Sequence, residues 1–159
     1  MKFKKKGKSL DLIGWREWVS LPELRVKSIK AKIDTGARTS SLHVSYIKKI
    51  AGSNTLQFII HPDQDSSEPK IHATAIMIEE RSVKSSNGAS KIRPVIQTSV
   101  KLGGEMYTVE LTLVNRDLMG FRMLLGREAL KNRFLVDSGK SFLLPSPKPK
   151  PKKKNRREK

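Results

Sequence analysis

A succession of short apolar segments, each bounded by turn residues, is the feature that most constrains the fold of this chain. Residues 26–34 alternate Val26, Ile29, Ala31 and Ile33 with polar residues, with one slip of register. Similar segments occupy 14–21, 40–47, 54–61 and 71–80. A period of two is typical of strands that bury one face. The sequence therefore predicts an all-β domain with a closed or folded-over sheet.

Turn residues and one short helical pattern divide the rest of the chain. Asn87-Gly88 and Gly103-Gly104 suit the positive backbone angles of tight hairpin turns. Residues 61–70 are polar, contain two prolines and read as a loop. The stretch "GREALKNRF", residues 126–134, predicts a short C-terminal helix of about two turns.

Composition excludes several classes of protein. The chain has 159 residues, enough for one domain with a real core, and no cysteine, so it forms no disulfide, thiol nucleophile or thiolate zinc site. No apolar run approaches the ~20 residues of a membrane span. The basic start lacks the ~7–15-residue apolar region of a signal peptide. We therefore expect a cytoplasmic protein with no membrane association.

The net charge of +18 is concentrated at the two ends. Residues 1–8 contribute +5 and residues 145–159 contribute +7, which leaves +6 for the stretch between them. Such Lys- and Pro-rich ends predict disordered tails at 1–9 and 145–159 around a folded domain at 10–144. The tails either serve solubility or attach loosely to polyanions such as RNA, ribosomes or acidic proteins.

The stretch "KAKIDTGARTSSLHV", residues 30–44, carries a carboxylate and a glycine at the end of a predicted strand. Asp34 and Gly36 form an ordinary turn in the simpler interpretation, because both residue types favour turns. In the functional interpretation, Asp34 is one half of an aspartic-protease dyad. Two carboxylates about 3 Å apart share one proton, and the pair can activate a water molecule to attack a peptide bond.

Two motifs together point to a known family. "IDTGARTSSLH" at 33–43, followed later by "FRMLLGREAL" at 121–130, resembles the retroviral-type pepsins. A closer similarity covers about residues 12–144 and includes "IGWREWVSLPEL", "VKSSNG" and "LTLVNRD". On these stretches the chain is identified as a member of a bacterial branch labelled "ATP-dependent zinc protease", which is associated with ribosomal-protein glutamate ligases.

The resemblance implies a retropepsin-like closed β-barrel and an aspartic endopeptidase with one Asp-Thr-Gly motif per subunit. A homodimer would then bring together Asp34 from each chain. Thr35 would be the family's buried hydroxyl that bonds across the dimer, with Gly36 and Ala37 shaping the loop. The apolar-apolar-glycine motif Leu124, Leu125 and Gly126 would support the loop from below. The predicted hairpin at Asn87 and Gly88 would be a flap over the substrate, unless it is an ordinary surface turn.

The chain departs from the retroviral pattern at one position. An aspartate usually follows the catalytic residue by four positions and pairs with the arginine after the later glycine. Here that position is Arg38, facing the expected neighbourhood of Arg127. Two guanidinium groups repel, so Glu128, another acid or an acidic ligand is needed for compensation. A cleft with these two arginines would bind acidic, glutamate-rich peptides.

The residues indicate no cofactor. There is no Gly-x-x-x-x-Gly-Lys-Ser/Thr loop for a nucleotide phosphate and no His-Glu-x-x-His zinc motif. His43, His61 and His72 are widely spaced. His43 is a weak candidate for a metal ligand because it follows the Asp34 loop; it could equally form a hydrogen bond to the turn.

Three hypotheses follow. The first is an aspartic endopeptidase acting on acidic or glutamylated protein tails. The second is a protease-shaped binding module whose basic tails hold RNA, ribosomes or acidic proteins. Aromatic residues make up only 6% of the chain, so no base-stacking platform is apparent. The third retains zinc as a catalytic metal.

Overall fold

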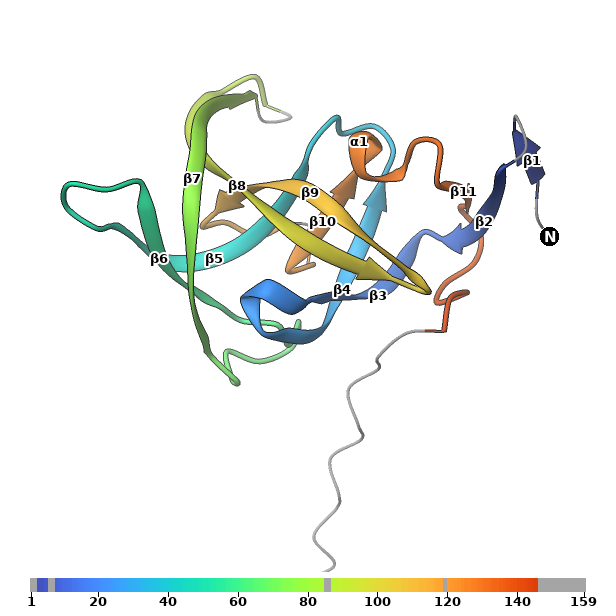
Figure 1. Ribbon diagram of the computed structural model, residues 1–159, viewed down its shortest axis with the longest axis horizontal. Coiled ribbons are helices and arrows are strands. Elements are labelled where there is room, and N and C mark those ends of the chain that lie inside the picture. Colours follow the sequence, from blue (N-terminus) through green and yellow to red (C-terminus); the bar gives the residue numbers. More distant parts are fainter. Residues whose placement is uncertain (1–2, 6–7, 85–86, 119, 146–159) are drawn as a thin grey trace, which may run out of the picture.

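The structure is a computed structural model that describes residues 3–5, 8–84, 87–118 and 120–145 (Figure 1). Strands dominate it, as the alternating segments predict. The strands are β1 Phe3–Lys5, β2 Lys8–Gly14, β3 Arg16–Leu21, β4 Val26–Asp34, β5 Ser40–Lys49, β6 Thr55–Ile60, β7 Ile71–Lys84, β8 Ser90–Leu102, β9 Glu105–Val114, β10 Met123–Gly126 and β11 Phe134–Asp137. A 3-10 turn, η1, spans Pro22–Leu24, and the helix α1 spans Arg127–Leu130.

The main sheet closes on itself. Strand pairs run β10–β4–β3–β8–β9–β5, and β5 pairs with β10 to complete the ring. Strands β6 and β7 extend the sheet between β5 and β8. Closure removes the free edges that an open sheet would present. The expected closed β-barrel is therefore confirmed.

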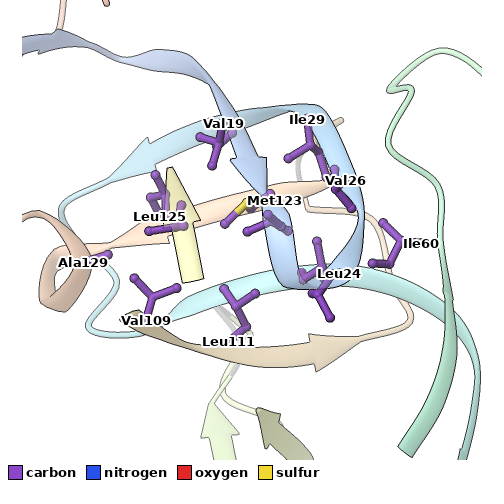
Figure 2. Close-up of a cluster of buried hydrophobic side chains, with 14 of the residues drawn as sticks. Val19, Leu24, Val26, Ile29, Ile60, Val109, Leu111, Met123, Leu125 and Ala129 are labelled. Carbon is purple, nitrogen blue, oxygen red and sulfur yellow. The ribbon is translucent and has the colours of Figure 1, made fainter. Parts of the chain in front are cut away.

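Apolar side chains from all sides of the ring meet inside it (Figure 2). Val19 and Ile29 face each other across β3 and β4. Met123 and Leu125 from β10 are fully buried in the same cluster, together with Leu111 from β9. The alternation in the sequence is therefore the signature of strands with one face turned into the barrel.

Both predicted hairpins are present. β7 and β8 pair antiparallel and turn near Gly88, whose φ is +83°, and β8 and β9 turn at Gly103, whose φ is +61°. Positive φ costs glycine little, which explains the residue at both turns.

The predicted C-terminal helix is shorter than expected. α1 covers Arg127–Leu130 because Lys131 leaves the helical region, with ψ of 139°, and Asn132 follows with φ of +63°. Within the described residues, no helix combines the length and the apolarity needed to cross a bilayer.

The N-terminal segment differs from the tail expected at 1–9. β1 pairs antiparallel with β2, which begins at Lys8, and β2 pairs in parallel with β11. Backbone pairing with a neighbouring strand thus orders residues whose composition alone indicated a solvated end. The predicted C-terminal tail, apart from Pro145, lies outside the described residues.

A buried carboxylate joins the end of the domain to the barrel. Glu17 is fully buried and accepts hydrogen bonds from the backbone N–H groups of Gly14 at 2.8 Å, Leu143 at 2.9 Å and Leu144 at 3.1 Å. Backbone donors can satisfy a buried carboxylate in this way. Residues 143–144 therefore belong to the folded domain.

Replacing Leu125 by Ala should lower the free energy of unfolding by about 2–5 kcal/mol, because it opens a cavity at a fully buried position. Urea unfolding followed by circular dichroism measures this change. Ile92→Ala, at a side chain 69% exposed, is the control and should change stability by less than about 0.5 kcal/mol. Equal losses in the two variants would contradict the assigned core.

Candidate active site

Asp34 is the last residue of β4 and begins the loop that leads to β5. Its Oδ1 accepts hydrogen bonds from the backbone N–H groups of Gly36 at 3.1 Å and Ala37 at 3.2 Å. These bonds form an Asx-type turn and fix the carboxylate relative to the loop. The structure thus supports the turn interpretation of Asp34 and also gives this partly buried carboxylate a defined orientation.

Gly126 lies directly beside Asp34 because β10 runs parallel to β4, with Gly126 opposite Asp34 and Leu125 opposite Ile33. The Gly126 N–H donates to the Ser40 hydroxyl at 3.0 Å, and that hydroxyl is buried. A Cβ on Gly126 would lie 2.5 Å from the Thr39 carbonyl oxygen. Only glycine fits at this close approach.

Further backbone hydrogen bonds join the start of α1 to the Asp34 loop. The N–H of Arg127 donates to the Ala37 carbonyl at 2.7 Å, and the N–H of Glu128 donates to the Arg38 carbonyl at 3.1 Å. The Arg127 guanidinium also donates to the Thr35 carbonyl at 2.9 Å. The two motifs recognised in the sequence therefore form one unit.

Leu124, Leu125 and Thr35 were also predicted to support the loop, and each has different surroundings. Leu125 points into the main core, whereas Leu124 packs with Val114 and Leu118 in a separate cluster. Thr35 is exposed in the single chain. Its predicted burial would therefore require a second subunit.

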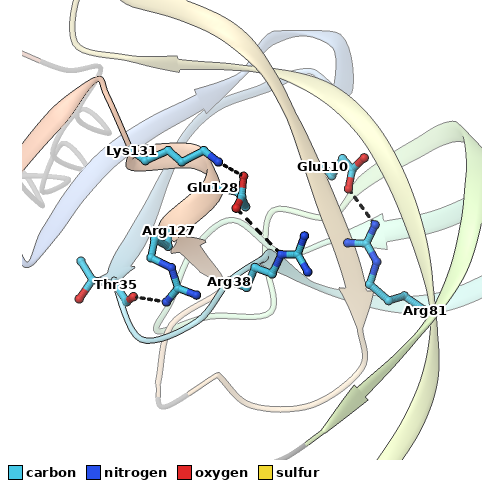
Figure 3. A network of polar contacts seen from close by, with 7 residues as sticks. All are labelled: Thr35, Arg38, Arg81, Glu110, Arg127, Glu128 and Lys131. Atoms are coloured by element: carbon cyan, nitrogen blue, oxygen red, sulfur yellow. Dashed lines mark hydrogen bonds and ion pairs between the residues drawn. The ribbon is translucent and has the colours of Figure 1, made fainter.

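Glu128 provides the acid that the two arginines need (Figure 3). Its carboxylate lies 4.0 Å from the Arg38 guanidinium and 2.8 Å from the Lys131 ammonium. The hydrogen bond from Lys131 lowers the pKa of Glu128 below its usual 4.5, and the charges of Lys131, Arg38 and Arg127 act in the same direction. Glu128 thus serves as an internal counterion for Arg38 and Lys131.

A groove of about 700 Å³ lies beside this unit. Its walls come from the Asp34 loop, the end of β7, β9 and α1, and the charged residues among them are Arg38, Arg81, Lys84, Glu110 and Glu128. Asp34 itself is not part of the wall, so the groove adjoins the C-terminal part of the loop, residues 38–40, and does not contain the carboxylate. Asn87 and Gly88 are at the tip of the β7–β8 hairpin, which rises at the same end of the barrel as the loop and α1 (Figure 1). This position suits a flap.

The surroundings of His43 and His61 do not fit a zinc site. The His43 Nδ1 lies 2.7 Å from the Arg116 carbonyl, and both ring nitrogens of His61 are hydrogen-bonded, to Ser45 and to the Ser67 carbonyl. Among the residues that the structure describes, no three His, Asp or Glu side chains are grouped to hold a metal ion. His43 is therefore engaged in a local hydrogen bond.

Three residues of the site were not singled out from the sequence. Ser40 accepts the Gly126 N–H, and Arg81 and Glu110 line the groove. The hydroxyl run "TSS" at 39–41 was a weak signal for Ser40. No local pattern distinguishes Arg81 or Glu110 from the charged residues of an ordinary exposed strand.

Replacing Gly126 by Ala should lower the free energy of unfolding by about 1–3 kcal/mol, because the new methyl group collides with backbone. Denaturant unfolding tests this. Gly104→Ala is the matched control, since nothing lies within 4 Å of its added Cβ, and its cost should be near zero. A Gly126→Ala protein as stable as the parent would show that the loop does not approach β10 as described.

The Glu128 carboxyl should titrate below pH 4.5 when followed by NMR. Since its folded pKa is lowered, its interactions stabilise the fold above the unfolded pKa and are lost as the pH falls through the folded pKa. High salt or Lys131→Met should move the midpoint back toward 4.5. A midpoint at or above 4.5 in low salt would show that the ion pairs do not form.

Comparison with known proteins identifies the family and a solved structure with the same fold. Residues 12–147 match the family described as "Retropepsin-like aspartic endopeptidase RimB". A crystal structure of a Legionella pneumophila protein of unknown function shares the fold, with a TM-score of 0.67 and 25% identity over 84% of this chain and 97% of that one.

Curated relatives are much longer than the part they share with this chain. A "Probable alpha-L-glutamate ligase" of Shewanella pealeana is 47% identical over 135 residues, which is 84% of this chain and 30% of the relative. One of Desulfotalea psychrophila is 43% identical over 128 residues, or 79% and 28%. The chain thus spans about 30% of the length of these relatives.

These comparisons do not support the label "ATP-dependent zinc protease". With 12–147 matched and Asp34 held beside Gly126, the chain belongs to the RimB-like family of retropepsin-like aspartic endopeptidases.

Proposed function

We propose that the protein is an aspartic endopeptidase that acts as a homodimer, with Asp34 of each subunit forming the catalytic dyad. The observation that carries this proposal is the fixed position of the Asp34 carboxylate, which accepts two backbone N–H bonds beside Gly126. One chain supplies a single Asp-Thr-Gly motif. A twofold axis would bring two copies of the same residue together.

In the proposed reaction the dyad shares one proton. The ionised carboxylate removes a proton from a water molecule, which attacks the peptide carbonyl, while the protonated carboxyl donates a hydrogen bond to the carbonyl oxygen. The apparent pKa values of such a pair belong to both residues jointly. The β7–β8 hairpin would close over the peptide and exclude water.

We propose acidic or glutamylated protein tails as substrates. The groove carries the cations Arg38, Arg81 and Lys84 against two glutamates, which favours a ligand with carboxylates. The curated relatives are named as probable glutamate ligases, and adding glutamate creates tails of this kind. Arg127 is bonded to the Thr35 carbonyl, so its proposed contribution to substrate binding is to position the loop.

The dimer interface is proposed to include the Asp34 loop. Thr35 and Gly36 are exposed there, so a second loop can approach them. The stretch "FLVDSGKSFLL", residues 134–144, is the alternative candidate for this interface. It is already used within the chain, because β11 pairs with β2 and Glu17 binds Leu143 and Leu144.

Asp34→Asn should lower the cleavage rate of glutamate-rich peptides by roughly 10²–10⁴-fold. Mixing equal amounts of parent and variant should halve the activity per parent molecule, since random pairing leaves about a quarter of dimers with two carboxylates. Peptide cleavage followed by mass spectrometry measures both effects.

Asp65→Asn, the same chemical change on an exposed loop, is the control. It should leave the cleavage rate unchanged, and mixing it with the parent should not lower the activity per parent molecule. A variant at Asp34 that cleaves like the parent would rule out the dyad. Constant activity per parent molecule in the mixture would rule out the shared site. If no peptide is cleaved and ligands bind with steep salt dependence, the binding module that uses basic tails is the better description.

A further inference from the structure

Arg81 connects the flap strand to the barrel. It lies on β7 and donates to the Glu110 carboxylate of β9 at 2.9 Å (Figure 3). It also contacts Glu79 on its own strand. The Arg81 side chain is 29% exposed and the Glu110 side chain 46% exposed. Both residues line the groove beside the Asp34 loop. The ion pair is therefore accessible from the place where a substrate would lie.

The opposite side of the groove repeats this arrangement. Arg38 extends from the Asp34 loop, with its guanidinium 4.0 Å from the Glu128 carboxylate. Figure 3 shows Arg38 between Glu128 and the Arg81–Glu110 pair. Each of the two guanidinium groups thus has an internal glutamate as its partner in the free protein.

The surroundings of Arg81 make a carboxylate partner necessary. Arg93 lies directly opposite Arg81 in the β7–β8 register, and directly opposite residues share one face of the sheet. Lys84 lines the same groove. The hydrogen bond that Arg81 donates to the Glu110 carboxylate is the largest cause of the raised pKa of Arg81, with Glu79 adding to it.

We propose that Arg81 is a specificity-determining residue that binds a side-chain carboxylate of an acidic peptide, and that Glu110 occupies this position until the peptide displaces it. The inference rests on the acidic substrates of the proposed function and identifies the groups that select them. A guanidinium presents several N–H donors in one plane, so an incoming carboxylate can take over the bonds made to Glu110.

The exchange has a geometric consequence. The Arg81–Glu110 bond ties β7, one strand of the flap hairpin, to β9 of the barrel. When a glutamate of the peptide replaces Glu110, the Arg81 side chain links β7 to the substrate instead of to β9. Arg38, held by an exposed ion pair of 4.0 Å, can bind a second carboxylate in the same way.

The test measures binding separately from cleavage. In the full chain carrying Asp34→Asn, fluorescence anisotropy gives the Kd of a labelled oligoglutamate peptide, with an oligoglutamine peptide of equal length as the reference. Adding Glu110→Gln should tighten oligoglutamate binding roughly 3–10-fold, because it removes one of the two internal carboxylates that compete for Arg81. Adding Arg81→Gln should weaken it by roughly 5–30-fold. In the Arg81→Gln background, Glu110→Gln should have little further effect.

Glu80→Gln is the matched control, since it makes the same charge change at the neighbouring exposed position of β7. If Glu80→Gln tightens binding as much as Glu110→Gln, the effect is general electrostatics and the inference is wrong. It is also wrong if oligoglutamate binding is unchanged by both the Arg81 and the Glu110 substitutions.

Cleavage of the same peptide by the parent protein separates the two proposals. Cleavage with no dependence of binding on Arg81 and Glu110 overturns this inference and leaves the endopeptidase standing. The expected pattern of binding without any cleavage supports the inference and overturns the endopeptidase. Absence of any preference for oligoglutamate over oligoglutamine overturns the inference and the proposed substrate class together.

Discussion

The parallel pairing of β10 with β4 is the constraint on which the candidate site depends. It places Gly126 beside Asp34 and Leu125 beside Ile33, although almost the whole barrel separates them along the chain. The close approach of Gly126 to the Thr39 carbonyl lets the N–H groups at the start of α1 donate hydrogen bonds to carbonyls of the Asp34 loop. Without that contact, the Asp34 loop would be a surface turn with no fixed relation to α1 and the groove.

Closure of the barrel makes this pairing possible. The strands β3, β8, β9 and β5 complete the ring between β4 and β10, and their inward side chains form one core. The site is therefore attached to the most buried part of the molecule, while the Asp34 loop and the tip of the β7–β8 hairpin remain at the surface. Rigid support beneath exposed functional groups is the usual arrangement for positioned chemistry.

Internal carboxylates balance the charge around the site. Glu128 lies between Arg38 and Lys131, and Glu110 pairs with Arg81. All these groups are partly exposed, so the pairs contribute little to stability and can exchange partners at low cost. The same arrangement keeps the cations in place and leaves them available to a competing acidic ligand.

Local features were predictable because they depend on neighbouring residues. The alternation at 26–34 predicted β4 with the bounds that the structure shows, and both glycine turns were found. The helix was predicted too long because Asn132 adopts a positive φ that the composition of 126–134 does not reveal. The N-terminal strands were missed because β1 and β2 depend on pairing with each other and with the distant β11.

The sequence by itself determined the all-β class, the carboxylate loop at Asp34, its similarity to the retroviral-type pepsins and the need for an acid near Arg38 and Arg127. Tertiary structure alone decided that Glu128 is such an acid, that Ser40 receives the Gly126 N–H, and that Arg81 meets Glu110 in the groove. The physical reason is that these contacts join segments distant in sequence. Only the register of the closed barrel, which no local pattern encodes, brings their side chains within bonding distance.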